Sequence, residues 1–285
     1  MPAAPWRFDA IGVPWQIETA RPLAGDDRER IRAVIADFDR SWSRFRDDSA
    51  VAALAAGAGP VRAPADAAAM LEVYGQLSDA TAGAVNPLVG DALASRGYDR
   101  SLSLVDRGAR PAPPAAGVRV AGDLLEVDPP ALIDVGALGK GRLVDLVLAA
   151  VPAALGPAVV DASGDIAVRA TTQRIGLEHP FDARRAIGVW TVTDAALCAS
   201  AANRRAWGAG LHHVLDARTG EPVRTVAATW AVAPDAMHAD AAATALFFEG
   251  GPRLAARWDV AWVRMLTDGR VEWSPGCDAD LFVAR

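Results

Sequence analysis

The chain carries the segment Asp134-Val-Gly-Ala-Leu-Gly-Lys140-Gly-Arg-Leu-Val-Asp145, in which three glycines separate two apolar runs. The first run, Leu-Ile-Asp-Val at 132–135, predicts a short strand, and the second predicts a helix over about 140–155. A strand, a glycine-rich turn and a helix bring backbone amides and a helix N-terminus together, where they can hold phosphate. We therefore predict a phosphate-binding turn here, with a plain strand-to-helix connection as the alternative.

Lys140 is the only lysine among the 29 basic residues of the chain, and all the others are arginine. A lysine that remains where arginine is otherwise preferred offers a compact ammonium on a flexible stem, which arginine does not. Glycines flank it on both sides, at Gly139 and Gly141. This pattern favours a functional role for Lys140, and retention of the lysine by chance is the alternative.

The same segment excludes two common classes of nucleotide-binding protein. No Ser or Thr follows Lys140, so the turn is not the Walker A loop of an ATPase. The glycines also lack the GxGxxG spacing of a dinucleotide-binding Rossmann fold.

Outside this segment, strands and helices are interspersed without the strict alternation of a parallel sheet. Helices are predicted over 26–45, 49–57, 64–83 and 240–248, and the apolar face of the first consists of Ile31, Ile35, Phe38, Trp42 and Phe45. Strands are predicted over 8–19, 118–135, 158–193 and 227–234. We therefore expect an α+β fold with largely antiparallel sheets and packed helices. A single domain should span 1–285, with a motif-bearing core over about 10–250 and a C-terminal hairpin at 258–285 packed on it.

Composition narrows the function further. The 285 residues are 52% hydrophobic and 22% charged, as in a globular protein, and the net charge of −6 argues against nucleic-acid binding. No apolar run approaches the roughly 20 residues that span a bilayer. Residues 1–15 lack the basic and apolar regions of a signal peptide, and the two cysteines are too few for a disulfide framework. These features predict a cytoplasmic protein that does not insert into a membrane.

Asp240-Ala-Ala-Ala-Thr244 places a carboxylate and a hydroxyl four residues apart, on one face of the predicted helix. Both groups are hard oxygen ligands of the kind that Mg²⁺ takes. The spacing allows a magnesium site, but taken alone this segment favours a helix N-cap at Asp240 with a buried Thr244.

The segment from His212 to Gly220 holds two of the four histidines and is predicted as a strand that enters a tight turn at Thr219-Gly220. Adjacent residues of a strand face opposite ways, so only one of the two histidines should reach a given site. A neutral histidine near a phosphate ester can act as a general base; His213 is the candidate, and Asp216 is the next choice. The alternative is a surface histidine pair before an Asx-type turn, which we favour for His212. The histidines and cysteines lack zinc-ligand spacing, and a GxSxG elbow is missing.

A fourth segment, from Thr81 to Gly90, is a helix end followed by the stiff dipeptide Asn86-Pro87. Asn86 is one of only two asparagines in the chain. An ordinary loop that begins at Asn-Pro is the strong alternative to a functional role.

Taken in order, these segments resemble the FAD:protein FMN transferase family, also called the ApbE family, over about residues 10–250. The matching positions are Gly12, Ser43 to Phe45, Thr81 to Pro87, Asp134 to Gly141 with Asp145, Gly164-Asp165, His213 to Gly220, and Ala239 to Leu246. The resemblance implies an ApbE-like, T-fold-like architecture. It also implies a Mg²⁺-dependent transferase that cleaves FAD, attaches FMN by a phosphoester bond to a Thr or Ser of a target flavoprotein, and releases AMP.

The resemblance also implies which residues form the site. Magnesium would be held by Asp240, Thr244 and the backbone carbonyl of Gly139, where the family has alanine. FAD, the substrate, would be bound by Gly12, Thr81, Gly83, Asn86, Asp134, Gly136, Lys140, Gly164 and Asp165. Lys140, or the amides beside it, would steady the phosphate oxygens. The chain departs from the family pattern at Ala137, Ser163, Ala201 and Ala217, and the side chains at 137 and 163 would narrow the flavin site.

Two related functions fit the same residues. One is a Mg²⁺-dependent FAD pyrophosphatase, in which water replaces the acceptor hydroxyl, and the other is a non-catalytic FAD-binding protein. The sequence does not identify the acceptor protein or the preferred metal, and it allows either a monomer or a homodimer.

Overall fold

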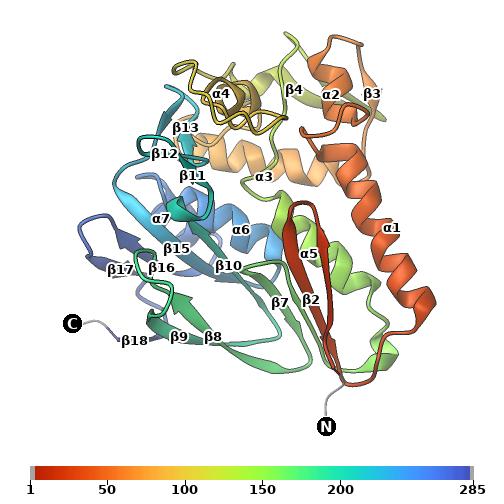
Figure 1. The fold of residues 1–285 in the computed structure, drawn as a ribbon, viewed down its shortest axis with the longest axis vertical. Helices are drawn as coiled ribbons and strands as arrows, with labels where there is room; N and C mark the ends of the chain where they lie inside the picture. Colours follow the sequence, from red (N-terminus) through yellow and green to blue (C-terminus); the bar gives the residue numbers. More distant parts are fainter. Residues whose placement is uncertain (1–3, 283–285) are drawn as a thin grey trace.

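An eight-stranded antiparallel sheet forms the centre of the structure, a computed structural model that describes residues 4–282 (Figure 1). The strand order is β1-β2-β6-β7-β10-β15-β16-β17. Their bounds are β1 Trp6–Ala10, β2 Val13–Thr19, β6 Ala158–Asp161, β7 Asp165–Arg169, β10 Ala196–Ala201, β15 Val226–Ala233, β16 Ala261–Leu266 and β17 Val271–Trp273. Because side chains alternate along a strand, each strand presents one row of apolar residues to each face of this sheet.

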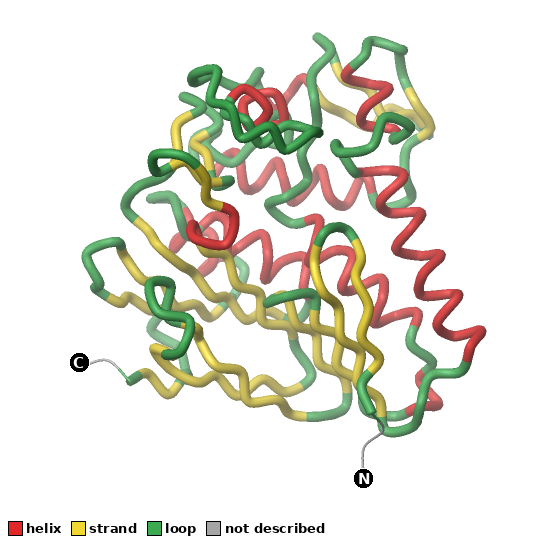
Figure 2. The backbone as a smooth tube through the Cα atoms, in the orientation of Figure 1, coloured by secondary structure: helices red, strands yellow, loops and turns green. Residues whose placement is uncertain are grey.

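Helices cover one face of the main sheet, and Figure 2 shows them gathered on that side. Side chains of α1, α5 and α6 form one apolar cluster with Trp15 and Ile17 of β2, and α3 and α7 pack behind α6. The helices are α1 Gly25–Trp42, α2 Ala50–Ala55, α3 Ala67–Ala80, α4 Gly90–Ser95, α5 Gly139–Ala150, α6 Ala236–Ala245 and α7 Gly251–Arg257.

A second antiparallel sheet, of order β18-β9-β8, packs on the other face of the main sheet. Trp190 of this sheet and Trp230 of β15 belong to the same buried cluster. Its strands are β8 Thr172–Glu178, β9 Ala186–Thr193 and β18 Asp280–Leu281. Short strands complete the fold as β3 Val61–Arg62, β4 Val118–Ala121, β5 Leu124–Val127, β11 Ala206–Trp207, β12 Leu211–His212, β13 Leu215–Asp216 and β14 Glu221–Pro222. Helices and antiparallel sheets thus confirm the predicted α+β class.

The helices α5 and α6 are in direct backbone contact. A Cβ atom added at Gly141 of α5 would lie only 2.1 Å from the carbonyl oxygen of Ala236 and 2.7 Å from Cβ of Asp240. The Asp145 carboxylate of α5 also accepts the N–H of Ala236 at 2.8 Å and of Met237 at 3.0 Å, at the start of α6. The N-terminus of α5 is therefore fixed against the middle of α6.

The predicted strand at 132–135 is wrong. No strand is assigned there, because the backbone bonds to residues 87–91 instead of a sheet. Gly90 N–H donates to Leu132 O at 3.1 Å, and Asp134 N–H donates to Pro87 O at 2.8 Å. The helix that follows also ends at Ala150 rather than near 155, and Pro152 comes directly after its last turn.

Three other expectations change in detail. Residues 8–19 form not one strand but the hairpin β1–β2, turning at Ile11 and Gly12, whose φ angles are +45° and +78°. The first helix ends at Trp42, so Phe45 is not part of its buried face and is 38% exposed. The C-terminal hairpin is antiparallel as predicted, but β16 pairs with β15 and so extends the main sheet rather than packing on it.

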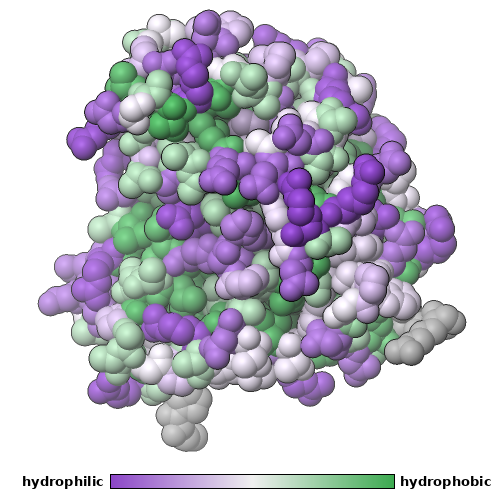
Figure 3. Space-filling model, turned by 180° about the vertical axis from the view of Figure 1, so that it is seen from behind, coloured by the Kyte–Doolittle hydropathy of each residue, from purple (hydrophilic) through white to green (hydrophobic). Residues whose placement is uncertain are grey.

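Polar side chains lie between the apolar ones over the rear face of the molecule (Figure 3). Within residues 4–282, no helix combines the length and the apolar character needed to cross a bilayer.

Candidate active site

One large cavity brings together most of the predicted site residues. Its volume is about 860 Å³, within the size range of small-molecule sites. Its walls come from the turn of the β1–β2 hairpin, the start of α5, the middle of α6, the end of β10 with residues 203–205, and the loop after β12. The predicted residues that line it are Gly12, Asn86, Asp134, Gly136, Gly139, Lys140, Gly164, His213, Asp240 and Thr244.

Lys140 lies among carboxylates in one wall of this cavity. Its Nζ atom is 3.2 Å from Oδ2 of Asp165 and donates to the carbonyl of Ala162 at 3.1 Å. Burial lowers the pKa of Lys140, but the negative charges of Asp165 and Asp240 outweigh this, and the net pKa is raised. Lys140 therefore carries a charge in the cavity wall, and Asp165 already compensates much of it.

Asp240 is 3% exposed, and its carboxylate accepts the N–H of Gly141 at 2.9 Å. Burial, followed by the nearby charge of Asp165, raises the pKa of Asp240 well above its usual value. One ammonium, that of Lys140, thus faces two buried carboxylates. A bound cation would supply the missing positive charge, because buried carboxylates are stabilised by opposite charges nearby.

The donor atoms near Asp240 fit a hard divalent cation. In the part of the chain that the structure describes, the Thr244 hydroxyl makes no hydrogen bond, and it lies on the same cavity wall one helical turn from Asp240. Gly139 lines that wall as the first residue of α5. A carboxylate, a hydroxyl and a carbonyl form an oxygen set suited to Mg²⁺. Between residues 4 and 282, no group of three or more His, Cys, Asp or Glu side chains is arranged for a metal.

Asp240 does not cap a helix, so that interpretation of this segment is wrong. The N-cap of α6 is Asp235, whose side chain accepts the N–H of His238 at 2.9 Å.

His213 and His212 lie in different surroundings, as their adjacent positions predicted. His213 lines the cavity, and its Nδ1 atom is buried with no hydrogen-bond partner among the described residues. Burial, helped by the charge of Arg205, lowers the pKa of His213 to about 3. His212 is outside the cavity lining, and its Nε2 atom is 2.7 Å from the carbonyl oxygen of Val223. His212 is only 8% exposed, so the expected surface histidine is in fact buried.

A family model described as the ApbE family matches residues 11–262, which include every segment that lines the cavity. The chain belongs to the ApbE family. Two curated ApbE relatives are similar in sequence and are both named FAD:protein FMN transferase. The protein of Rhodobacter capsulatus is 27% identical over 308 aligned residues, which cover 96% of this chain and 57% of that protein. The protein of Treponema pallidum is 31% identical over 256 residues, 78% of this chain and 71% of that protein.

Solved ApbE structures share the fold. The ApbE protein of Thermotoga maritima superposes with a TM-score of 0.82 at 20% identity, over 96% of this chain and 97% of that one. The flavin transferase ApbE of Vibrio cholerae gives a TM-score of 0.79 at 19% identity, over 96% and 98%. These likenesses confirm the ApbE-like architecture expected from the sequence.

Four of the predicted site residues do not line the cavity: Thr81, Gly83, Asp165 and Asp216. The Thr81 hydroxyl donates to Leu77 O at 2.7 Å and accepts the N–H of Val85 at 3.0 Å, so it shapes the turn after α3. Asp165 is fully buried behind Lys140.

Asp216 forms an ion pair with Arg218, with 2.6 Å between Oδ2 and Nη2. It also accepts the N–H of Arg218 at 3.0 Å, which is the predicted Asx-type turn. Both bonds hold the carboxylate in the turn, outside the lining of the cavity to which His213 belongs. Asn86 does line the cavity, but its side chain bonds to the carbonyl of Pro113 and the N–H of Leu88.

The chain departs from the ApbE pattern at four positions, some in the cavity wall and some in the protein interior. Ala137, Ser163 and Ala201 line the cavity, whereas Ala217 is buried elsewhere. Ser163 has a φ of +60°, a left-handed conformation that a glycine adopts without strain. The side chains at 137 and 163 therefore do occupy space at the cavity wall.

Arg44 is a cavity residue that the sequence analysis did not identify. Its side chain is 2% exposed and forms an ion pair with Asp134 across the cavity wall. The guanidinium also lies over the rings of Phe45 and Tyr98, at 4.2 and 4.8 Å from their centroids. Arg44 stands between matched residues Ser43 and Phe45, but nothing in the local pattern indicates a buried ion pair with a residue 90 positions away.

Proposed function

We propose that this protein is a FAD:protein FMN transferase that binds FAD in the 860 Å³ cavity. It would cleave the pyrophosphate, join FMN through a phosphoester bond to a Ser or Thr hydroxyl of a target flavoprotein, and release AMP. The observation that carries the proposal is the single cavity that Lys140, His213, Asp240 and Thr244 share, although they come from separate segments. The names of the curated relatives support the same activity.

Asp240, Thr244 and the carbonyl of Gly139 would hold Mg²⁺. When bound, the ion would neutralise charge on the phosphate oxygens and favour departure of AMP. Arg205 adds positive charge to the cavity wall, and it has no ion-pair partner among the described residues. Because the charge of Asp165 offsets that of Lys140, Lys140 would act on the phosphates mainly by donating hydrogen bonds.

His213 would accept the proton of the incoming hydroxyl. The hydroxyl oxygen forms a bond to the phosphorus of the FMN half, the bond from that phosphorus to the AMP oxygen breaks, and the proton passes to the imidazole. A pKa of about 3 keeps the ring neutral at neutral pH but makes it a weak base in the absence of FAD. The negative phosphates of bound FAD would raise this pKa, because a nearby negative charge favours the imidazolium.

Lys140→Met is expected to slow turnover by roughly 10- to 100-fold, because the methionine keeps the length of the side chain but leaves Asp165 buried without its partner. Lys140→Arg should restore turnover only in part, since the planar guanidinium does not fit beside Gly139 and Gly141. FAD titration and AMP release on both variants provide the measurement. Full activity of Lys140→Arg would contradict a specific need for an ammonium.

The transferase assignment is tested by incubation with FAD, Mg²⁺ and a candidate flavoprotein subunit. Covalent FMN on the subunit, read by in-gel fluorescence, should appear in equal amounts with AMP. AMP without labelled protein would instead assign a FAD pyrophosphatase. FAD that stays intact after long incubation would indicate a binding protein without catalysis.

A further inference from the structure

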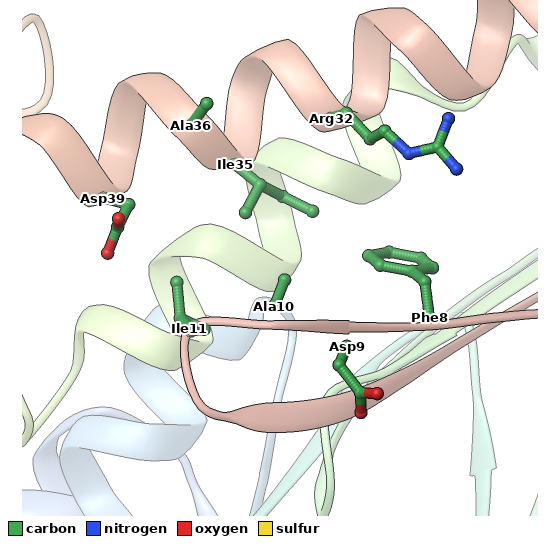
Figure 4. Close-up of a pocket in the computed structure, with 8 residues that line it drawn as sticks. All are labelled: Phe8, Asp9, Ala10, Ile11, Arg32, Ile35, Ala36 and Asp39. Atoms are coloured by element: carbon green, nitrogen blue, oxygen red, sulfur yellow. The ribbon is translucent and has the colours of Figure 1, made fainter.

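A second, smaller groove of about 410 Å³ lies between the β1–β2 hairpin and α1. Phe8, Ala10 and Ile11 form its wall on the hairpin side, and Ile35 faces them from the helix, whereas the side chain of Ala36 points away from the hairpin at the rim of the groove (Figure 4). The groove thus lies between apolar side chains of a strand and of a helix.

The groove meets the large cavity at one end. Ile11 and Asp39 line both, so the two spaces adjoin at the turn of the hairpin. A chain lying in the groove would therefore reach the cavity that holds His213 and Asp240.

The strand that forms one side of the groove is an edge of the main sheet, because β1 pairs only with β2 (Figure 1). Ile11 and Gly12 form a two-residue turn, so Ala10 and Val13 exchange hydrogen bonds and the pairs alternate from there. Asp9 opposite Pro14 is accordingly a non-bonded pair, which suits a proline without an N–H. By the same alternation, Arg7 and Asp9 direct their backbone N–H and C=O groups to the outer edge.

These outward groups have no partner among residues 4–282. An edge of this kind, beside a helix, can accept an extended polypeptide as an added strand whose alternate side chains enter the groove.

The far end of the groove is basic. Arg32 lines the groove there and Arg28 lies beside it over the Trp6 ring, and within the described part of the chain neither has an ion-pair partner. The guanidinium carbons of Arg28 and Arg32 are 5.5 and 5.1 Å from the centre of the Trp6 ring, so the two charges are held close together. A segment that carries an acidic side chain would match this end.

We propose that the groove between β1 and α1 binds the acceptor protein, an inference that rests on the proposed transferase function. An extended acceptor segment pairs with the backbone of Arg7 and Asp9, places apolar side chains against Phe8 and Ile35, and directs an acidic residue toward Arg32. The five residues of β1 extend for about 17 Å at the rise of a strand. The segment then passes Ile11 and delivers its Ser or Thr hydroxyl to the cavity.

Two variants block the groove without touching the cavity. Asp9→Pro removes the outward N–H at an edge position where proline is tolerated, and Asp9→Asn is its control because it keeps the N–H. Ala36→Trp places a large ring at the rim of the groove on the helix side, and its control is Ala33→Trp, at an exposed position of α1 outside the groove.

The KM for a flavoprotein subunit that the wild-type protein labels should rise about tenfold in Asp9→Pro, as expected for the loss of one backbone hydrogen bond. Ala36→Trp should raise it at least as much, whereas the two control variants should not. FAD affinity should stay unchanged in all four variants. Arg32→Glu should also raise this KM, and the effect should shrink as salt is added. Hydrogen exchange should show protection of the Arg7 and Asp9 amides when the subunit binds.

An unchanged KM in both blocking variants, or no protection of β1, would overturn the groove as the acceptor site. Pairing of β1 between two copies of this chain, seen as a dimer that Asp9→Pro dissociates, would overturn it as well. AMP release without any labelled subunit in the wild type is a different failure, because it removes the transferase function itself.

Discussion

Asp240→Asn is expected to abolish most turnover while the chain stays folded. The asparagine keeps the shape of the side chain and an oxygen that can accept the N–H of Gly141, now 2.9 Å from the carboxylate. It removes the charge that a hard cation requires, so we expect turnover to fall by at least about a hundredfold. Because the variant also removes repulsion between two buried carboxylates, its thermal stability without metal should not decrease.

Magnesium itself provides a readout that does not depend on activity. A ligand that binds the folded state raises the unfolding temperature by mass action, so Mg²⁺ should stabilise the wild type and fail to stabilise Asp240→Asn. Thr244→Ala should lie between the two, since it removes a neutral ligand. Turnover by the wild type in excess EDTA would contradict the assignment of this site.

His213→Ala should slow FMN transfer by roughly 10²–10⁴-fold and leave FAD affinity nearly unchanged. In the proposed mechanism the imidazole would accept the proton of the acceptor hydroxyl, whereas the other groups of the site would act on the phosphates. FAD binding by fluorescence quenching, measured beside transfer, separates the two effects. Normal transfer by His213→Ala would move the base to another residue, with Asp216 as the next candidate.

His212→Ala is the matched control from the same segment. Its ring bonds to the carbonyl of Val223 outside the cavity, so this variant should lose roughly 1 kcal/mol of stability and retain transfer. Loss of transfer in His212→Ala with normal transfer in His213→Ala would reverse the assignment of the two histidines.

The low pKa of His213 also affects stability in acid. Its folded value of about 3 lies below the ordinary 6.5, so the unfolded state binds the proton more readily. The stability that comes from a neutral buried His213 is complete above about pH 6.5 and is lost as the pH falls toward 3. The unfolding temperature of His213→Ala should therefore fall less between pH 6.5 and pH 3 than that of the wild type.

The spacing of local motifs predicted residues that line the cavity better than it predicted their partners. Asp240 and Thr244 share a helical face because they are four residues apart in α6. His212 and His213 lie in different surroundings, although β12 ends at His212 and the predicted strand does not continue through His213. The ion pair of Arg44 with Asp134 joins residues 90 positions apart, and no local pattern encodes it. Asp216 fitted the role of a base by residue type, but Arg218 beside it holds its carboxylate in the turn.

The errors in the fold have a similar origin. An apolar run at 132–135 is compatible with a strand, yet whether it joins a sheet depends on which backbone lies beside it, and here residues 87–91 do. Phe45 continues the helical spacing of α1, but the helix ends at Trp42, so spacing alone placed it in the core.

The absence of a side chain at Gly141 has a consequence for motion. With its backbone this close to Ala236 and Asp240, α5 and α6 cannot slide past each other without a collision between main-chain atoms. The turn that holds Lys140 and the helix turn that holds Asp240 and Thr244 therefore move as one rigid body. A motion that opens the cavity to FAD would therefore take place in the opposite wall. In relaxation experiments, the amides of α5 and α6 should show no exchange process of their own.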